Sequence, residues 1–225
     1  MKKINFLKIA AFNLILVAFT LSLYSFSKKG FFNGVIEYKV ELDSDELDAA
    51  SKAMLGSLSS KMFFSGHKTR IEMDMGMVVN TTITDSKNKE GVILIDMMGQ
   101  KYAMEMSKED IEKAEKENAE PKIEYTNETK KVAGYNCKKA LVTMEGLDEV
   151  LSVYYTDEIN VPENDQFKGL KGFPLEYQIN QGGMKMKFTA VNVTEKKVDD
   201  SLFTIPSGYE KVSKDELNKL FGGGM

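Results

Sequence analysis

Cysteine, histidine and tryptophan are almost missing from this chain of 225 residues, which contains one, one and none of them. The single cysteine, Cys137, cannot form an internal disulfide, and a chain of this length can build its core without one. The single histidine, His67, lies in the expected turn SGHKTR with no serine or cysteine motif around it, so a hydrolytic triad has no base. Phosphate-binding loops, zinc-ligand spacings and dinucleotide fingerprints are also absent. We therefore expect no enzyme activity, no catalytic residue, no metal and no cofactor.

Basic residues are too few and too scattered for a nucleic-acid partner. Lysine and arginine number 30 against 34 acidic residues, which gives a formal net charge of −4, and no basic block interrupts the sequence. Phosphate contact needs clustered lysine or arginine, so we expect no nucleic acid to bind. The carboxylates alternate with apolar residues, as on solvated strand faces, and nothing in their spacing points to a glycosidase pair.

The first residues have the pattern of an export signal. Three lysines precede the apolar run IAAFNLILVAFTLSLYSF, and small residues stand at positions minus three and minus one of a cleavage site after Ser27. Residues 1–27 are then a signal peptide, and residues 28–225 form a single domain that is periplasmic or secreted. The alternative is an uncleaved anchor, because the apolar run approaches the length of a membrane span.

Beyond this segment, apolar and charged residues alternate with the period of two that is typical of half-buried strands, as in GVIEYKVEL. Frequent turn signals such as SKNKEG, MGQ and NQGG favour antiparallel hairpins over βαβ units. In MMGQKY we expect a tight hairpin with Gly99 at a position of positive φ. The predicted fold class is mainly β (α+β), with a single strongly curved antiparallel sheet or incomplete β-barrel.

Three segments have helical patterns. Ser44–Ser60 carries apolar residues at helical spacing, among them Met54 and Leu58, after a serine that can cap the helix. The charged segment SKEDIEKAEKENAEPK is expected to be a solvated helix or a flexible insertion. In SKDELNKLFGGGM, Ser213 and Glu216 form a capping box.

Methionines recur at alternate positions in RIEMDMGMVVN, MEM and MKM. Since residues i and i+2 of a strand point to the same side, these methionines are expected to share strand faces. The first expected face, with a bend or bulge at Gly76, consists of Ile71, Met73, Met75, Met77 and Val79.

Three explanations of the methionines compete: filling of an irregular core, a Cu(I) site, and an adaptable apolar pocket. Copper is the weakest of the three, because Glu72, Asp74 and Glu105 are hard ligands and no methionine cluster contains a histidine or cysteine. If there is a pocket, the expected ligand-lining residues are Met73, Met75, Tyr102, Met104, Met106, Met184, Met186, Phe188, Met54 and Leu58.

Several stretches together resemble an exported bacterial family, domain of unknown function 4412. They are KTRIEMDMG, DMMGQKYAMEM, TNETKKVAGYNCKKA, YYTDEINV, FKGLKGFPLEY and LFTIPSGYEKVSKDEL, and they extend from about Phe32 to Phe221. The family is similar in architecture to the outer-membrane lipoprotein carrier of Gram-negative periplasms, an incomplete β-barrel whose concave face is covered by helices and can hold acyl chains. The resemblance implies the same fold here, with the helix at Ser44–Ser60 as a lid, and it supplies no catalytic or binding residue.

These observations lead to two main hypotheses. The first is a periplasmic carrier or binding protein for an apolar ligand, such as a lipid or a lipoprotein acyl group. The second is an envelope module that interacts with a protein, or senses one, and carries no ligand. A concave apolar cavity favours the first hypothesis, and a filled interior favours the second.

Overall fold

The computed structural model describes residues 30–43, 58–117, 120–144, 150–162, 167–181 and 184–220. The chain divides into two compact units, Met1–Gly30 and Phe31–Met225, and all described helices and strands belong to the second. The expected signal segment, residues 1–27, lies outside the described residues and stays a prediction.

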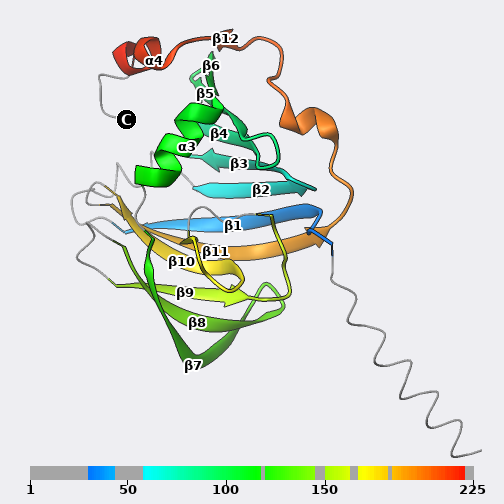
Figure 1. Cartoon of the computed structure of the whole chain (residues 1–225), viewed down its shortest axis with the longest axis vertical. Coiled ribbons are helices and arrows are strands. Elements are labelled where there is room, and N and C mark those ends of the chain that lie inside the picture. Colours follow the sequence, from blue (N-terminus) through cyan, green and yellow to red (C-terminus); the bar gives the residue numbers. More distant parts are fainter. Residues whose placement is uncertain are drawn as a thin grey trace, which may run out of the picture. The chain divides into compact units, whose positions relative to one another are not determined.

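A single sheet of twelve strands dominates this unit (Figure 1). Its spatial order is β12-β6-β5-β4-β3-β2-β1-β11-β10-β9-β8-β7, and among the described strands only β12 and β6 pair in parallel. The strands are β1 (Gly34–Asp43), β2 (Ser59–Ser65), β3 (Lys68–Asp74), β4 (Val78–Asp85), β5 (Glu90–Met97), β6 (Gln100–Met106), β7 (Lys122–Val132), β8 (Tyr135–Thr143), β9 (Leu151–Thr156), β10 (Phe173–Gln181), β11 (Met184–Glu195) and β12 (Glu210–Lys211). The described helices are α3 (Lys108–Glu117), the 3-10 turn η2 (Asp200–Phe203) and α4 (Lys214–Leu220).

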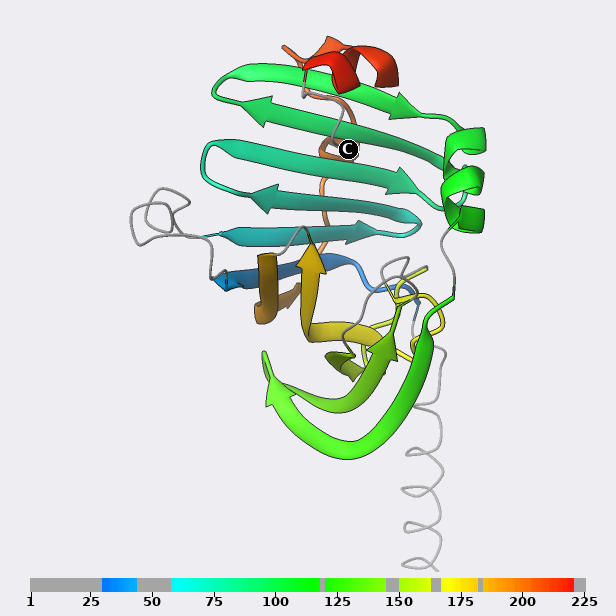
Figure 2. The same cartoon turned by 90° about the vertical axis from the view of Figure 1, so that its left-hand side faces the viewer.

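The sheet is curved and does not close. In Figure 2, strands β2 to β6 form an extended layer, whereas β7 and β8 curl around the opposite end. The two halves meet where β1 pairs with β11. The predicted fold class, one curved antiparallel sheet with a few helices, is therefore confirmed.

The C-terminal segment defines the two faces of β3–β6. The Arg70 guanidinium on β3 donates a hydrogen bond of 2.9 Å to the carbonyl oxygen of Leu202 in η2. The same side of the sheet carries a small apolar cluster of Ile83, Leu94 and Ala103, covered by Phe203, Ile205 and Tyr209. We call this covered side the outer face and the opposite side the inner face.

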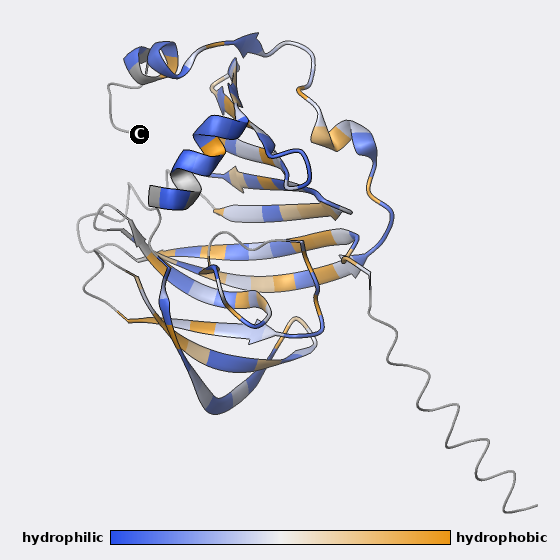
Figure 3. Ribbon diagram, in the orientation of Figure 1, coloured by the Kyte–Doolittle hydropathy of each residue, from blue (hydrophilic) through white to orange (hydrophobic). Residues whose placement is uncertain are grey.

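The main core fills the inner side of the sheet around β1, β10 and β11. The Tyr177 ring stacks on Phe188 at 4.8 Å between centroids, and Phe167 meets Tyr177 edge-on at 5.3 Å. The Tyr38 hydroxyl donates a hydrogen bond of 2.7 Å to the carbonyl oxygen of Pro174, which satisfies it in a buried position. The alternation of polar and apolar residues that produces these faces is visible along the strands in Figure 3.

Several local predictions are confirmed. Gly99 has φ 90° in the β5–β6 hairpin, and Met98 before it also has positive φ, as in a type I′ turn. The charged segment forms α3, and in α4 the Ser213 hydroxyl donates to the Glu216 carboxylate while the Glu216 N–H donates to the Ser213 hydroxyl.

The prediction for Ser44–Ser60 is wrong at its C-terminal end. Ser59 and Ser60 begin strand β2, because they pair with β1 and β3 in the sheet. The rest of that expected helix, residues 44–57, lies outside the described residues, as does its Met54.

Candidate functional site

Side chains from six neighbouring strands form continuous rows on the inner face. The strand register aligns Tyr38, Ser60, Met73, Asn80, Ile95 and Tyr102 in one row. A second row contains Ile36, Met62, Ile71, Thr82, Ile93 and Met104, and a third contains Gly34, Phe64, Thr69, Thr84, Gly91 and Met106. Because adjacent strands lie about 4.8 Å apart, Met73 and Tyr102 are separated by about 14 Å along their row.

Burial changes along these rows. On β1 and β2 the side chains of Tyr38, Ile36 and Met62 are buried in the main core. On β3 to β6 most inner-face side chains, Met73 and Met104 among them, are only half-buried, although Ile95 is 4% exposed; Ile93 and Met104 belong to neither apolar cluster formed by the described residues. We call this part of the inner face the methionine face; it consists of Ile71, Met73, Asn80, Thr82, Ile93, Ile95, Met97, Tyr102, Met104 and Met106, all of them half-buried except Ile95.

The structure thus brings five of the expected ligand-lining residues to one area. Met73, Tyr102, Met104 and Met106 lie on the methionine face itself, and Met75 follows β3 and packs against the main core beside Met73. No single strand reveals this grouping, because it depends on the register of β3 to β6.

The prediction that Met77 and Val79 continue the face of Met73 is wrong. Strand β3 ends at Asp74, whose carboxylate accepts a hydrogen bond from the Gly76 N–H, and Gly76 has φ 82°. The chain reverses there, so Val79 pairs with Asp74 and points to the outer face. Met77 lies in the turn and is 54% exposed.

The remaining expected residues lie in the other half of the sheet. Phe188 is 5% exposed in the main core, Met186 is packed against that core, and Leu58 is 7% exposed within it. Met184 begins β11, two residues before Met186. Whether any of these residues contacts a ligand stays a prediction.

One polar atom stands out on the methionine face. The Oδ1 atom of Asn80, between Met73 and Ile95, is buried and has no hydrogen-bond partner among the described residues. A buried carbonyl oxygen without a partner costs about 1–3 kcal/mol, so this atom destabilises the fold locally between the apolar side chains of Met73 and Ile95.

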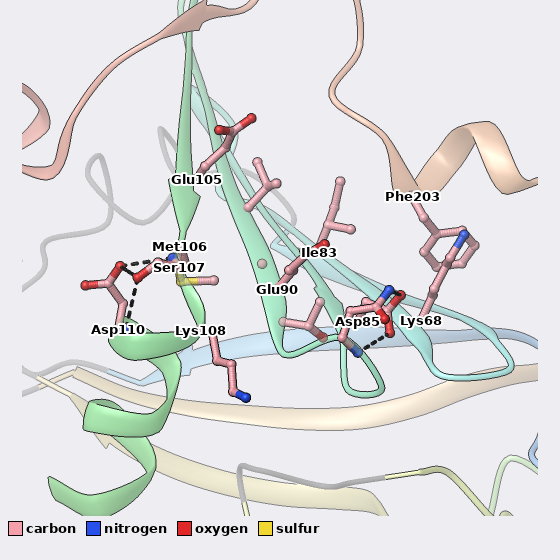
Figure 4. A pocket seen from close by; sticks show the side chains of 14 residues that line it. Lys68, Ile83, Asp85, Glu90, Glu105, Met106, Ser107, Lys108, Asp110 and Phe203 are labelled. Carbon is pink, nitrogen blue, oxygen red and sulfur yellow. Dashed lines mark hydrogen bonds between the residues drawn. The ribbon is translucent and has the colours of Figure 1, made fainter.

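A pocket of about 910 Å³ opens at the end of the sheet, between the β4–β5 hairpin, the end of β6 and α3 (Figure 4). Its lining residues Ile83, Val92 and Phe203 belong to the outer face, and only its inner edge, at Gly91 and Met106, adjoins the methionine face. Two of its charged side chains make local hydrogen bonds: Asp85 holds the hairpin turn and Asp110 caps α3 through Ser107. Of the expected ligand-lining residues that the structure describes, only Met106 borders this pocket. The sequence reasoning missed the pocket, because the hairpin and the helix that form it are brought together only by the fold.

Helix α3 packs against the inner face of β5 at Gly91, where the absence of a side chain makes room for its residue Ile111. A Cβ atom at Gly91 would collide with Met106 Cε and would lie 3.7 Å from Ile111 Cδ1. The glycine therefore lets Met106 and Ile111 lie over β5, and α3 covers the end of the third row.

The buried Cys137 thiol and Tyr38 phenol are held in their protonated, unreactive forms. Burial raises the pKa of the Cys137 thiol and raises the pKa of Tyr38 well above its ordinary value. In the described part of the chain, no three or more histidine, cysteine, aspartate or glutamate residues are placed to share a metal ion. No helix among the described residues has the length and apolarity to cross a membrane.

Known structures with a related chain trace include PNGF-II, with 19% identity, a TM-score of 0.48 and 84% coverage of this chain. This chain spans about a third of the length of PNGF-II, 32%. The lipoprotein LppX of Mycobacterium tuberculosis is 9% identical, with a TM-score of 0.37 and coverage of 74% of this chain and 89% of LppX. A β-barrel-like protein of domain of unknown function 1849 from Brucella abortus is 12% identical, with a TM-score of 0.29 and coverage of 75% and 99%.

No curated protein sequence matches the chain. Residues 54–218 match the family described as N-glycanase peptide, N-terminal domain, and this match includes the methionine face and the pocket. The chain therefore belongs to the PNGase F-II N-terminal domain family.

Proposed function

We propose that this domain is a non-catalytic binding protein, periplasmic or secreted, that holds an apolar ligand against the methionine face. The ligand class is a lipid or a lipoprotein acyl group. The observation that carries the proposal is the set of thioether and apolar side chains on β3, β5 and β6, with Asn80 and Thr82 of β4 between them, opposite a face already covered by the C-terminal segment. Flexible, polarisable methionine side chains suit apolar ligands of variable shape.

The packing of the other half restricts where such a ligand can lie. The space enclosed by β1 and β9–β11 is filled by Tyr38, Phe167, Tyr177 and Phe188, each at most 5% exposed. An acyl chain is therefore expected along the rows of β3 to β6, with Met106 at one end, and not inside the curled half of the sheet. The resemblance to domain of unknown function 4412 belongs to this proposal as well, since its lipoprotein-carrier-like architecture motivates the ligand class.

A binding experiment with a matched control tests the proposal. Protein purified from its native host is extracted with organic solvent, and the extract is analysed for lipids by mass spectrometry. A fluorescent fatty acid is then titrated into the wild type, into Met73→Gln/Met104→Gln and into the control Met98→Gln. Met98 is 81% exposed at a hairpin tip outside the methionine face, so the control makes the same chemical change away from the site.

The double variant is expected to bind at least about tenfold more weakly, because each substitution removes about 1 kcal/mol of apolar contact, while Met98→Gln binds like the wild type. If no lipid co-purifies and the double variant binds the fatty acid as well as the wild type does, the proposal is wrong.

The filled core and the family favour a second function, in which the domain binds a protein partner. The family's description refers to the N-terminal domain of an N-glycanase, so such a domain is one part of a longer enzyme. Here the same surface would contact a protein and would hold no lipid.

A photo-crosslinking amino acid at position 104 separates the two functions. Irradiated in the native host, it should give an adduct with the mass of a lipid if the first proposal holds. An adduct with the mass of a polypeptide, absent when the crosslinker is at position 98, would favour the second.

A further inference from the structure

Two methionines stand out at the tips of adjacent hairpins. Met77 in the β3–β4 turn is 54% exposed, and Met98 in the β5–β6 turn is 81% exposed. The backbone N–H of Met98 donates a hydrogen bond of 3.3 Å to the carbonyl oxygen of Met77, so the two turns are joined. We call Met77 and Met98 the tip pair.

Neither side chain is needed to hold its turn. The Asp74 carboxylate accepts from the Gly76 N–H at 2.8 Å, and the Asp96 carboxylate accepts from the Gly99 N–H at 3.2 Å. Met98 has φ 53°, a conformation in which asparagine or glycine is favoured and methionine is not. Conversion of these side chains to a more polar group would therefore leave both turns and both cores intact.

Other sulfur atoms of the described chain are much less accessible. Cys137 is 1% exposed, and burial raises the pKa of its thiol, so the reactive thiolate is scarce. Met62 is 7% exposed in the main core, and Met73 and Met104 on the methionine face are half-buried. Because susceptibility to oxidants follows accessibility, the exposed sulfur atoms of Met77 and Met98 are expected to react faster than the half-buried and buried ones.

We infer that the tip pair is an oxidation site that reacts with peroxides or hypohalous acids before the methionine face does. In the reaction with hydrogen peroxide, a lone pair of the thioether sulfur attacks one peroxide oxygen. An S–O bond forms, the O–O bond breaks and water leaves after proton transfer. Sulfur is oxidised by two electrons to the sulfoxide and the peroxide is reduced to water. The apolar character of the methionine face is thereby kept while oxidant is consumed at the tips.

Limited oxidation with peptide mapping tests this inference. The full chain is treated with hydrogen peroxide in native buffer and in concentrated urea, and sulfoxide at each methionine is followed by mass spectrometry over time. In native buffer, Met98 and Met77 are expected to oxidise at least about tenfold faster than Met62, and the order should vanish in urea. The thermal unfolding midpoint of the doubly oxidised protein should equal that of the untreated protein.

The variant Met77→Leu/Met98→Leu serves as the second arm. With two equivalents of hypochlorous acid, the wild type should carry its sulfoxides on the tip pair, whereas the variant should carry them on Met73, Met104 and other half-buried methionines. Oxidation of the methionine face of the wild type at the same rate as the tips would overturn the inference. So would a lowered unfolding midpoint once only the tip pair is oxidised.

Discussion

Replacing Asn80 by valine is expected to stabilise the protein, although the change removes a polar side chain from the middle of the candidate site. The Oδ1 atom of Asn80 is buried without a hydrogen-bond partner among the described residues, and Met73 and Ile95 flank it on the neighbouring strands. Relief of an unsatisfied carbonyl oxygen is worth about 1–3 kcal/mol, and the extra volume of valine offsets part of that gain. We therefore expect the free energy of unfolding to rise by about 1–2 kcal/mol.

The corresponding change in melting temperature can be estimated. A unit of the size of Phe31–Met225 has an unfolding entropy of about 0.4 kcal/mol/K, so the midpoint should rise by about 2–5 °C in scanning calorimetry. Valine also has a higher β-propensity than asparagine. The control Asn80→Thr shares that propensity but keeps a polar atom, and it should therefore gain less than Asn80→Val.

The reasoning about Asn80 would be refuted if Asn80→Val lowered the midpoint, since Oδ1 would then have a partner that the substitution removes. Equal gains for valine and threonine would also refute it, because β-propensity alone would explain them.

Three further predictions concern the close contacts of two glycines, the turn at Met98 and the carboxylate of Glu128. Gly34→Ala should lower the free energy of unfolding by about 2–3 kcal/mol in chemical denaturation, because the new Cβ would collide with the backbone carbonyl oxygen of Thr194 in β11. Gly91→Ala should lower it by less than about 1 kcal/mol, because the flexible end of the Met106 side chain can move aside. Equal costs would contradict this distinction. Met98→Asn should raise the stability by about 1 kcal/mol, since asparagine tolerates the positive φ of this turn position, and an unchanged urea midpoint would count against it. Hydrogen bonds from the Lys139 ammonium and, to a smaller extent, from the Tyr154 hydroxyl hold the pKa of Glu128 below its ordinary value. The stabilisation that the Glu128 carboxylate provides is therefore present above the unfolded pKa of about 4.3 and is lost as the pH falls through the lower folded-state pKa. The difference in urea midpoint between the wild type and Glu128→Gln should accordingly shrink as the pH falls through the folded-state pKa of Glu128, and a difference that is the same at neutral and at strongly acidic pH would exclude this origin.

Alternation and turn chemistry made much of the fold predictable. The period of two in GVIEYKVEL and the glycine in MMGQKY each led to the element that the structure contains, because a half-buried strand and a type I′ turn restrict residue types locally. The capping box of Ser213 and Glu216 likewise marked the start of α4, since its hydrogen bonds join residues only three positions apart.

Long-range pairing explains the two errors. The alternation in RIEMDMGMVVN continues through Gly76, so the pattern could not show that the chain reverses there; the carboxylate of Asp74 and the pairing with β4 decide it. At Ser59 and Ser60 the helical spacing of the preceding residues conflicts with strand formation, and pairing with both β1 and β3 prevails.

By itself, the sequence determined that the chain forms antiparallel strands with one apolar side and that the methionines of MEM and MKM stand at alternate strand positions, because both properties follow from residue order. Only the tertiary structure decided which methionines meet. The register of β3 to β6 aligns Met73 with Tyr102 and places Met104 in the next row, whereas the pairing of β1 with β11 puts Phe188 into a filled core. Register and strand order arise from hydrogen bonds between segments far apart in the chain, and no local pattern records them.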